Sequence, residues 1–320
     1  MKPNSKFLKT SLITATLVFC ASWAQAQDWK PAGPVKMIIA FAAGGGADTQ
    51  ARLVAQTISE KTGWKIEPQQ VLGKGGLNAA AALKKEPADG TAIAMVVSET
   101  LAYDAISSKA KGLQLEDFTP LATTAEFQLG LVAMAKGKFA SWEAVKAASK
   151  AGTPIRFGTA SQRQADMAYH LSRQTGIKFN IVSVKGGAAI MNGLVAGDLD
   201  IGWVAGAQTK AVASGDMVNI ARGIATPLAM SPNAPSIKEL GGKFYLDGYF
   251  MFIAPKGMPA QVREAWGKAI REALETKDTP ANKLVVKGFG SPAVITGAKL
   301  DAYMRGAVSD VQALMADVAK

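Results

Sequence analysis

The sequence has one cysteine, Cys20, and one histidine, His170, among its 320 residues. A single cysteine excludes a disulfide within the chain, and a chain of this length buries enough surface to be stable without one. With one histidine and one thiol, neither a histidine-rich metal site nor a Ser-His-Asp arrangement has its usual parts. We therefore expect no metal, no cofactor and no catalytic residue of these types.

The sequence also lacks an apolar run of about 20 residues, the length that a membrane-spanning helix needs. Its first residues instead combine three lysines, an apolar stretch at 12–21 and the small-x-small sequence Ala24-Gln25-Ala26. This pattern is typical of a secretory signal peptide, so we expect residues 1–26 to be removed before Gln27. Cys20 leaves with that segment, and an exported chain without disulfides fits a bacterial periplasm best.

Concentrated positive charge is absent as well. The formal net charge is +11, and it falls to +8 without the three signal-peptide lysines because residues 1–26 contain no Asp or Glu. Binding to nucleic acid or to an anionic membrane needs a basic patch, whereas Lys and Arg are scattered along this chain. The charge therefore favours a solvated surface with some preference for small anionic ligands, and no nucleic-acid partner.

Apolar runs and amphipathic segments alternate along the chain. Residues 35–41, 64–71 and 91–97 read as strands, and residues 49–61 and 75–85 as helices between them. This order predicts a parallel sheet covered by helices. A second alternating unit follows from about residue 128 to 224. The chain then continues through a proline-containing connection, a strand at 249–254 and two amphipathic helices.

The glycine-rich loop at 41–48 lies between the first strand and the first helix. A helix that begins after such a loop directs unpaired N–H groups forward, which favours an anion. Gly44-x-Gly46-x-x-Thr49 lacks the third glycine of the dinucleotide-binding fingerprint, so a nucleotide is disfavoured. Ligands of parallel sheets bind at the carboxyl ends of the strands, where Ser98-Glu99-Thr100 also falls.

A second strand, loop and helix corner spans Ile155 to Thr175. Its loop, at 159–166, carries Arg163 beside the expected helix start, and both Ser161 and Asp166 are candidate N-caps. A guanidinium next to oriented N–H donors makes a carboxylate clamp in which each charge-assisted bond contributes about 1.5 to 3 kcal/mol. The alternative is a solvent-exposed arginine on a surface loop.

Six motifs together resemble the Bug (TctC-like) solute-binding receptors of tripartite tricarboxylate transporters, in order and across essentially the whole mature chain. They are Pro34-Val35-Lys36-Met37-Ile38-Ile39-Ala40-Phe41-Ala42-Ala43-Gly44-Gly45-Gly46-Ala47-Asp48, Lys74-Gly75-Gly76, Pro87-Ala88-Asp89-Gly90-Thr91, Val184-Lys185-Gly186-Gly187-Ala188, Leu194-Val195-Ala196-Gly197-Asp198-Leu199-Asp200 and Phe252-Ile253-Ala254-Pro255-Lys256-Gly257-Met258-Pro259.

The resemblance implies a type II periplasmic binding protein, an α/β fold in which two lobes joined by crossing strands close over a small carboxylate. Residues 27–126 and 247–320 would form lobe 1 and residues 127–246 lobe 2, with the hinge near 125–128 and 245–252. The implied ligand-binding residues are Phe41, Ala43, Gly44, Asp48 and Ser98 in lobe 1, and Thr159, Ala160, Ser161, Gln162, Arg163 and Lys185 in lobe 2.

The second loop departs from the family's usual glycine-rich Gly-Thr-Pro-Gly-x-Gly pattern. It reads Gly158-Thr159-Ala160-Ser161-Gln162-Arg163-Gln164, which exchanges backbone contacts for side-chain contacts. We therefore expect a ligand choice different from that of the commonest members, with Arg163 serving a carboxylate.

The expected function is a monomeric periplasmic receptor that captures a small organic acid, a dicarboxylate in the first instance, and delivers it to membrane permease subunits. Two alternatives stay open. One is a secreted enzyme acting on a carboxylate, with Asp48, Asp166 or Glu99 as acid or base. The other is a sensing module without transport.

Overall fold

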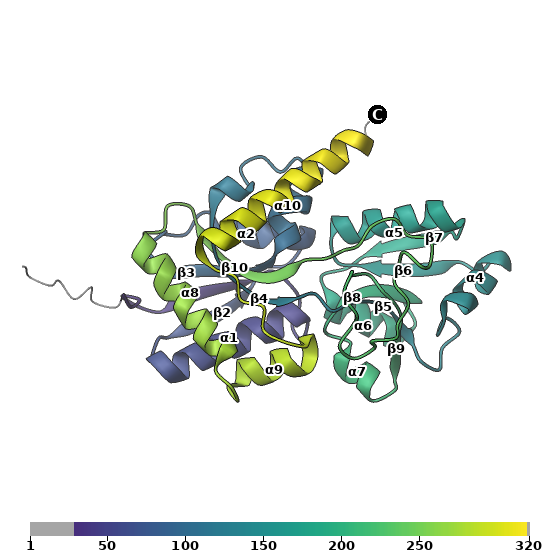
Figure 1. The fold of residues 1–320 in the computed structure, drawn as a ribbon, viewed down its shortest axis with the longest axis horizontal. Coiled ribbons are helices and arrows are strands. Elements are labelled where there is room, and N and C mark those ends of the chain that lie inside the picture. Colours follow the sequence, from purple (N-terminus) through teal and green to yellow (C-terminus); the bar gives the residue numbers. More distant parts are fainter. Residues whose placement is uncertain (1–28, 319–320) are drawn as a thin grey trace, which may run out of the picture.

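The computed structural model describes residues 29–318. The predicted signal peptide at 1–26 lies outside the described residues. The described chain forms two α/β lobes that lie side by side and are joined by extended segments (Figure 1). The predicted fold class, a two-lobed α/β binding protein, is confirmed.

The sheet of lobe 1 has the strand order β2-β1-β3-β10-β4, in which β10 runs antiparallel to both of its neighbours. Its strands and covering helices are β1 (Val35–Ile39), α1 (Gly46–Thr62), β2 (Ile66–Gln70), α2 (Leu77–Leu83), β3 (Ala92–Val97), α3 (Ala105–Ser107), β4 (Phe118–Glu126), β10 (Tyr249–Pro255), α8 (Ala260–Glu275), α9 (Pro280–Phe289) and α10 (Gly297–Val318). Every side chain of β3 is buried, as its unbroken apolar run predicts.

The sheet of lobe 2 repeats this plan with the order β7-β6-β8-β5-β9. Its elements are β5 (Leu129–Met134), α4 (Trp142–Lys150), β6 (Ile155–Thr159), α5 (Gln162–Thr175), β7 (Phe179–Ser183), α6 (Gly187–Ala196), β8 (Ile201–Ala205), α7 (Thr209–Ala213) and β9 (Met217–Arg222). The predicted alternation of strands and helices in this part of the chain is confirmed.

Two segments connect the lobes. The first sheet takes its strands from residues 35–126 and 249–255, and the second from residues 129–222. The chain therefore crosses once at 127–128 and returns through the long connection at 223–248. Phe127 on the first crossing packs edge-on against Phe250 on β10, with ring centroids 5.0 Å apart.

Two helical regions differ from their predictions: three helices, α8, α9 and α10, follow β10 where two were expected, and the helix expected at 75–85 starts late. Residues 75–85 were expected to form one helix, but a 3₁₀ turn (Lys74–Gly76) comes first and α2 begins only at Leu77. Gly75 and Gly76 have φ angles of +62° and +101°, which no right-handed helix contains. Packing also requires glycine at position 75, because an added Cβ would clash with the carboxylate of Asp104.

The two lobes are in contact on both sides of the cleft. The N–H of Ala42 donates to the carbonyl of Lys185 at 3.0 Å, and the hydroxyl of Tyr103 donates to the Asp166 carboxylate at 2.9 Å. The hydroxyl of Thr209 donates to the carbonyl of Gly288 at 3.1 Å. These contacts join residues of lobe 1 to residues of lobe 2, so the arrangement is a closed one.

Candidate functional site

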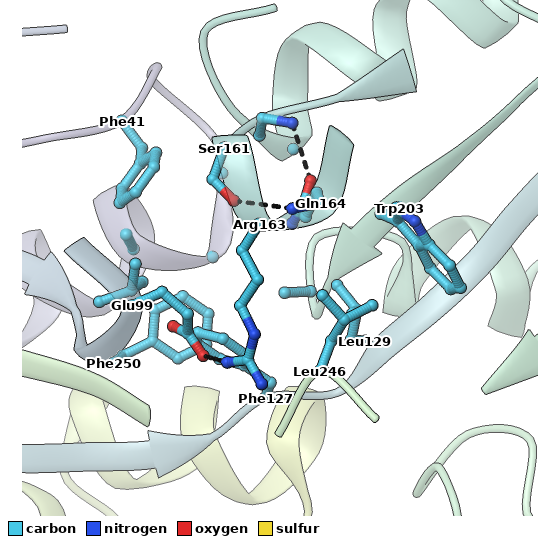
Figure 2. A pocket seen from close by; sticks show the side chains of 17 residues that line it. Phe41, Glu99, Phe127, Leu129, Ser161, Arg163, Gln164, Trp203, Leu246 and Phe250 are labelled. Atoms are coloured by element: carbon cyan, nitrogen blue, oxygen red, sulfur yellow. Dashed lines mark hydrogen bonds and ion pairs between the residues drawn. The ribbon is translucent and has the colours of Figure 1, made fainter. Parts of the chain in front are cut away.

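A cavity lies between the lobes, with about 640 Å³ of space when its open mouth is included. Both lobes and both crossing segments contribute to its wall. The lining residues are Phe41, Gly45, Gly46, Ala47, Val97, Glu99, Phe127, Leu129, Ala160, Ser161, Arg163, Gln164, Gly187, Trp203, Ala205, Leu246 and Phe250. Figure 2 shows these side chains, with Phe41 and Trp203 on opposite sides of the view.

Most of this wall is apolar. Its larger apolar side chains come from strands of both sheets, from the loop after β1 and from the crossings, and they are Phe41, Val97, Phe127, Leu129, Trp203, Leu246 and Phe250. Burial of such surface supplies most of the affinity of small-ligand sites, while a few polar groups fix the orientation. The polar groups that line this cavity therefore determine which ligand groups it holds and in which orientation.

The N-terminus of α1 supplies the first of these groups. Its N-cap, Gly45, has no side-chain oxygen to accept from the following amides. Within residues 29–318 the N–H groups of Gly46 and Ala47 have no acceptor, and both residues line the cavity. The N-terminus of α6 contributes Gly187, whose N–H is likewise unpaired in that part of the chain. Two positive helix ends thus meet at one cavity, an arrangement that favours an anion.

Trp203 adds a side-chain donor to the cavity wall. It lies on β8, it is 1% exposed, and its indole Nε1–H has no hydrogen-bond partner in the described chain. A buried indole N–H usually has a partner, and leaving it without one costs free energy. An acceptor from a bound ligand would remove that cost.

In contrast, the backbone N–H groups of the first three residues of α5 are bonded within the protein. Gln162 and Arg163 donate to Oδ1 of Asp104 at 3.0 and 3.4 Å. Gln164 donates to the N-cap hydroxyl of Ser161 at 3.3 Å. The N–H of Ala160 donates to Oε1 of Gln164 at 2.7 Å. Ser161, not Asp166, is therefore the N-cap of α5.

The guanidinium of Arg163 is bonded within the protein in the same way. Its Nη1 donates to Oε1 of Glu99 at 2.6 Å and to the carbonyl of Asp247 at 2.9 Å. Its Nη2 donates to the carbonyl of Tyr245 at 3.2 Å. Figure 2 shows its stem running through the cavity to the Glu99 carboxylate. Arg163, which was expected to serve a ligand carboxylate, thus forms an ion pair with Glu99 that links the lobes.

The structure brings four of the predicted site residues to the cavity wall: Phe41, Ala160, Ser161 and Arg163. The remaining seven predicted residues are absent from that wall: Ala43, Gly44, Asp48, Ser98, Thr159, Gln162 and Lys185.

Hydrogen bonds within the protein explain several of these absences. Asp48 accepts from the N–H of Gly44 at 3.0 Å and pairs with Arg52 at 2.8 Å, so its carboxylate is bonded within the protein. Ser98 is 2% exposed, and its hydroxyl accepts from the N–H of Tyr249. Lys185 has an exposed side chain, and only its carbonyl reaches the other lobe.

Sequence reasoning missed Trp203, Asp104 and the apolar residues of the crossings as site residues. It placed Glu99 on the correct rim but chose its neighbour Ser98. A tryptophan within a strand, two residues before the strand ends, was the available signal for Trp203. For Asp104 there was none, because the side chain reaches the cleft region through a single π-helical turn (Thr100–Asp104).

Two buried carboxyl groups have altered acidity. Burial raises the pKa of Glu99 to about 7, although the charge of Arg163 acts in the opposite direction. Burial also raises the pKa of Asp104 to about 8, and the charge of Glu99 adds to this rise. Both carboxyls therefore hold a proton to higher pH in the folded protein than in the unfolded chain.

This difference predicts that stability decreases as pH rises. Each carboxyl contributes its full stabilisation below its pKa of about 4 in the unfolded chain. This stabilisation is lost as pH rises toward its pKa in the folded protein. The side chain of Asp104→Asn does not titrate. Between pH 5 and 8 we therefore expect the free energy of unfolding to fall by at least about 1 kcal/mol more in the wild type than in this variant. Urea unfolding of both proteins at the two pH values measures this, and parallel losses would contradict it.

Within residues 29–318 the structure contains no cluster of three or more His, Cys, Asp or Glu side chains arranged to hold a metal ion. In the same part of the chain no helix has the length and hydropathy that crossing a membrane requires.

These features define a class of protein: a two-lobed α/β binding protein with a cavity in the interlobe cleft. The profile of the family described as "Tripartite tricarboxylate transporter family receptor" (TctC) matches residues 50–300. The chain belongs to this family, whose members are solute-binding receptors and not enzymes. The family expected from the sequence motifs is therefore confirmed.

Known proteins resemble the chain over nearly its whole length. Protein BugT of Bordetella pertussis is 28% identical over 294 residues, which cover 88% of this chain and 87% of BugT. Among solved structures, the periplasmic binding protein BugD superimposes with a TM-score of 0.79 at 21% identity, covering 91% of this chain and 99% of BugD. MatC from Rhodopseudomonas palustris with bound malate has a TM-score of 0.75 at 20% identity, with coverages of 88% and 98%.

Proposed function

We propose that the chain captures a small organic acid in the periplasm and delivers it to the permease subunits of a tripartite transporter. The ligand lies in the cavity between the lobes, and closure of the lobes presents a surface that the permease recognises. The protein acts as a monomer, because one chain contains both halves of the cavity.

One observation carries this proposal: unpaired donors gather at an apolar cavity. The N–H groups of Gly46, Ala47 and Gly187 and the buried indole N–H of Trp203 lack acceptors in the described chain. A ligand carboxylate supplies two acceptor oxygens and a negative charge, and it satisfies both the donors and the two helix ends. The apolar residues then enclose the rest of the molecule.

Membership of the receptor family and the malate bound to the related MatC support a carboxylate as the ligand class. The sequence of residues 1–26 supports export, and export supports an encounter with the ligand outside the cytoplasmic membrane. The dicarboxylate expected from the sequence stays a prediction, which a ligand panel tests directly.

The proposal predicts stoichiometric binding of a carboxylate without turnover. Purified protein is screened by thermal shift against mono-, di- and tricarboxylates, and each hit is titrated by calorimetry. We expect Trp203→Phe, which keeps an aromatic ring but loses the indole donor, to weaken binding of the hit about tenfold. Recovery of the ligand as a changed product, or the absence of any carboxylate hit, would contradict the proposal.

A further inference from the structure

Tyr103 and Asp104 join the two lobes, although neither side chain lines the cavity. Both lie in lobe 1, at the end of a single π-helical turn, and both bond to α5 of lobe 2. The Asp104 carboxylate accepts from the N–H groups of Gln162 and Arg163. The Tyr103 hydroxyl donates to Oδ2 of Asp166 at 2.9 Å. We call these three bonds the interlobe latch.

We infer that Tyr103 and Asp104 are positioning residues of the receptor. They stabilise the closed arrangement of the lobes, and they thereby raise the affinity for every acid that the cavity binds, without touching it. The part that concerns affinity rests on the proposed function, because it assumes that the cavity binds an acid. The part that concerns closure does not, because each bond of the latch joins two groups of the protein itself.

The first step of the argument concerns the N-terminus of α5. The first N–H groups of an α-helix have no acceptor within the helix, so those of Gln162 and Arg163 need one from elsewhere. Oδ1 of Asp104, in the other lobe, lies 3.0 and 3.4 Å from these two nitrogens. Asp104 is 1% exposed, and burial raises its pKa to about 8, so at neutral pH a neutral carboxyl oxygen is the acceptor. Separation of the lobes breaks both bonds.

The second step concerns the acceptor of the Tyr103 hydroxyl. Oδ1 of Asp166 accepts from Nε2 of Gln162 at 2.8 Å, which leaves Oδ2 for Tyr103. The carboxylate is thus held in the orientation that the contact with lobe 1 requires. Hydrogen bonds to a charged acceptor are about twice as strong as those between neutral groups. The Tyr103 bond therefore adds to the stability of the closed arrangement.

The third step concerns the support of the turn that carries both residues. Oγ1 of Thr100 donates to the carbonyl of Gly75 at 2.7 Å, and a Cβ on Gly75 would clash with the Asp104 carboxylate. The glycine motif at 74–76, which the proposed function does not use, therefore packs directly against this turn. A turn fixed in this way presents Tyr103 and Asp104 to α5 at a small cost in conformational entropy.

Hydrogen exchange without any added ligand tests closure. Solvent-exchange NMR at pH 7 follows the amides of Gln162 and Arg163, and we expect them to exchange at least twofold more slowly in the wild type than in Asp104→Ala, because Asp104 is their acceptor. Asp200→Ala is the matched control. Its carboxylate accepts from the N–H of Arg156 at 2.7 Å, but within lobe 2, so both exchange rates should equal those of the wild type.

Calorimetry with the acids found by the panel tests affinity. The apparent dissociation constant rises by the factor by which the closed population falls. We expect Asp104→Ala to weaken binding about tenfold and Tyr103→Phe about threefold, with unchanged ratios between acids. Asp104→Asn keeps the acceptor oxygen and should bind within about threefold of the wild type. The matched control is Tyr169→Phe, because that hydroxyl bonds to Arg173 within α5. Its affinity should not change.

The outcomes separate this inference from the proposed function. Equal exchange rates in the wild type and Asp104→Ala, or unchanged affinities in both latch variants, would overturn the inference while the receptor function stands. A weakening that differs among acids would show direct contact with the ligand and would equally overturn the positioning role. If no acid binds, the proposed function fails, and the exchange rates alone decide whether the latch closes the lobes. Tyr103→Phe, which loses only a hydroxyl, should raise the same two exchange rates and replaces Asp104→Ala if that variant does not fold.

Discussion

Arg163→Met is expected to lower the free energy of unfolding by about 3–5 kcal/mol at pH 8. The substitution keeps an apolar stem but removes the cation from Glu99, whose side chain is 6% exposed. It also leaves the carbonyls of Tyr245 and Asp247 without their side-chain donor. An uncompensated buried carboxylate is among the costliest defects that a single substitution creates. Chemical denaturation monitored by circular dichroism measures the loss.

Two comparisons isolate the ion pair as the cause. At pH 5 the loss is expected to be smaller, because Glu99, with a pKa of about 7, is protonated there and no charge is left unpaired. The double variant Arg163→Met/Glu99→Gln is expected to recover most of the stability at pH 8, since an amide replaces the buried charge. A loss that is equal at both pH values and persists in the double variant would contradict the buried-pair explanation.

Gly46→Val is expected to weaken ligand binding about 100-fold while leaving each lobe folded. A Cβ at this first residue of α1 would lie 2.7 Å from the carbonyl oxygen of Ala205 on lobe 2. It would also lie 3.2 Å from the Phe250 ring and 3.3 Å from the Phe289 ring. The lobes must separate at the N-terminus of α1 to make room, which removes the closed cavity. Calorimetry with the acid found by the panel measures the affinity.

The physical reason predicts a graded series with an internal control. Gly46→Ala adds only the Cβ and is expected to lie between the wild type and Gly46→Val. Gly306→Ala, in α10, adds a methyl group where nothing lies within 4 Å, and it should leave affinity unchanged. Small-angle scattering with saturating ligand should show compaction in the wild type and in Gly306→Ala only. Compaction of Gly46→Val would contradict the expected clash between its side chain and lobe 2.

Local sequence patterns were sufficient for the elements and their order. The apolar run at 91–97 and the capping serine Ser141 predicted β3 and the start of α4 because each depends on neighbours a few residues away. The glycine loop at 41–48 predicted the free N–H groups of α1 for the same reason. The local pattern was misleading at Gly75, which has a left-handed backbone conformation and packs against the distant side chain of Asp104.

What the sequence by itself determined is the two-unit α/β organisation, the helix start in lobe 1 that favours an anion, and the polar loop around Arg163. Only the tertiary structure decided the partners of that loop. Glu99 is 64 residues from Arg163 along the chain, and Asp104 is 58 residues from Gln162. These groups meet because closure brings the ends of β3 and β6 together across the cleft. The pairing of charges in the cavity is therefore a property of the closed fold.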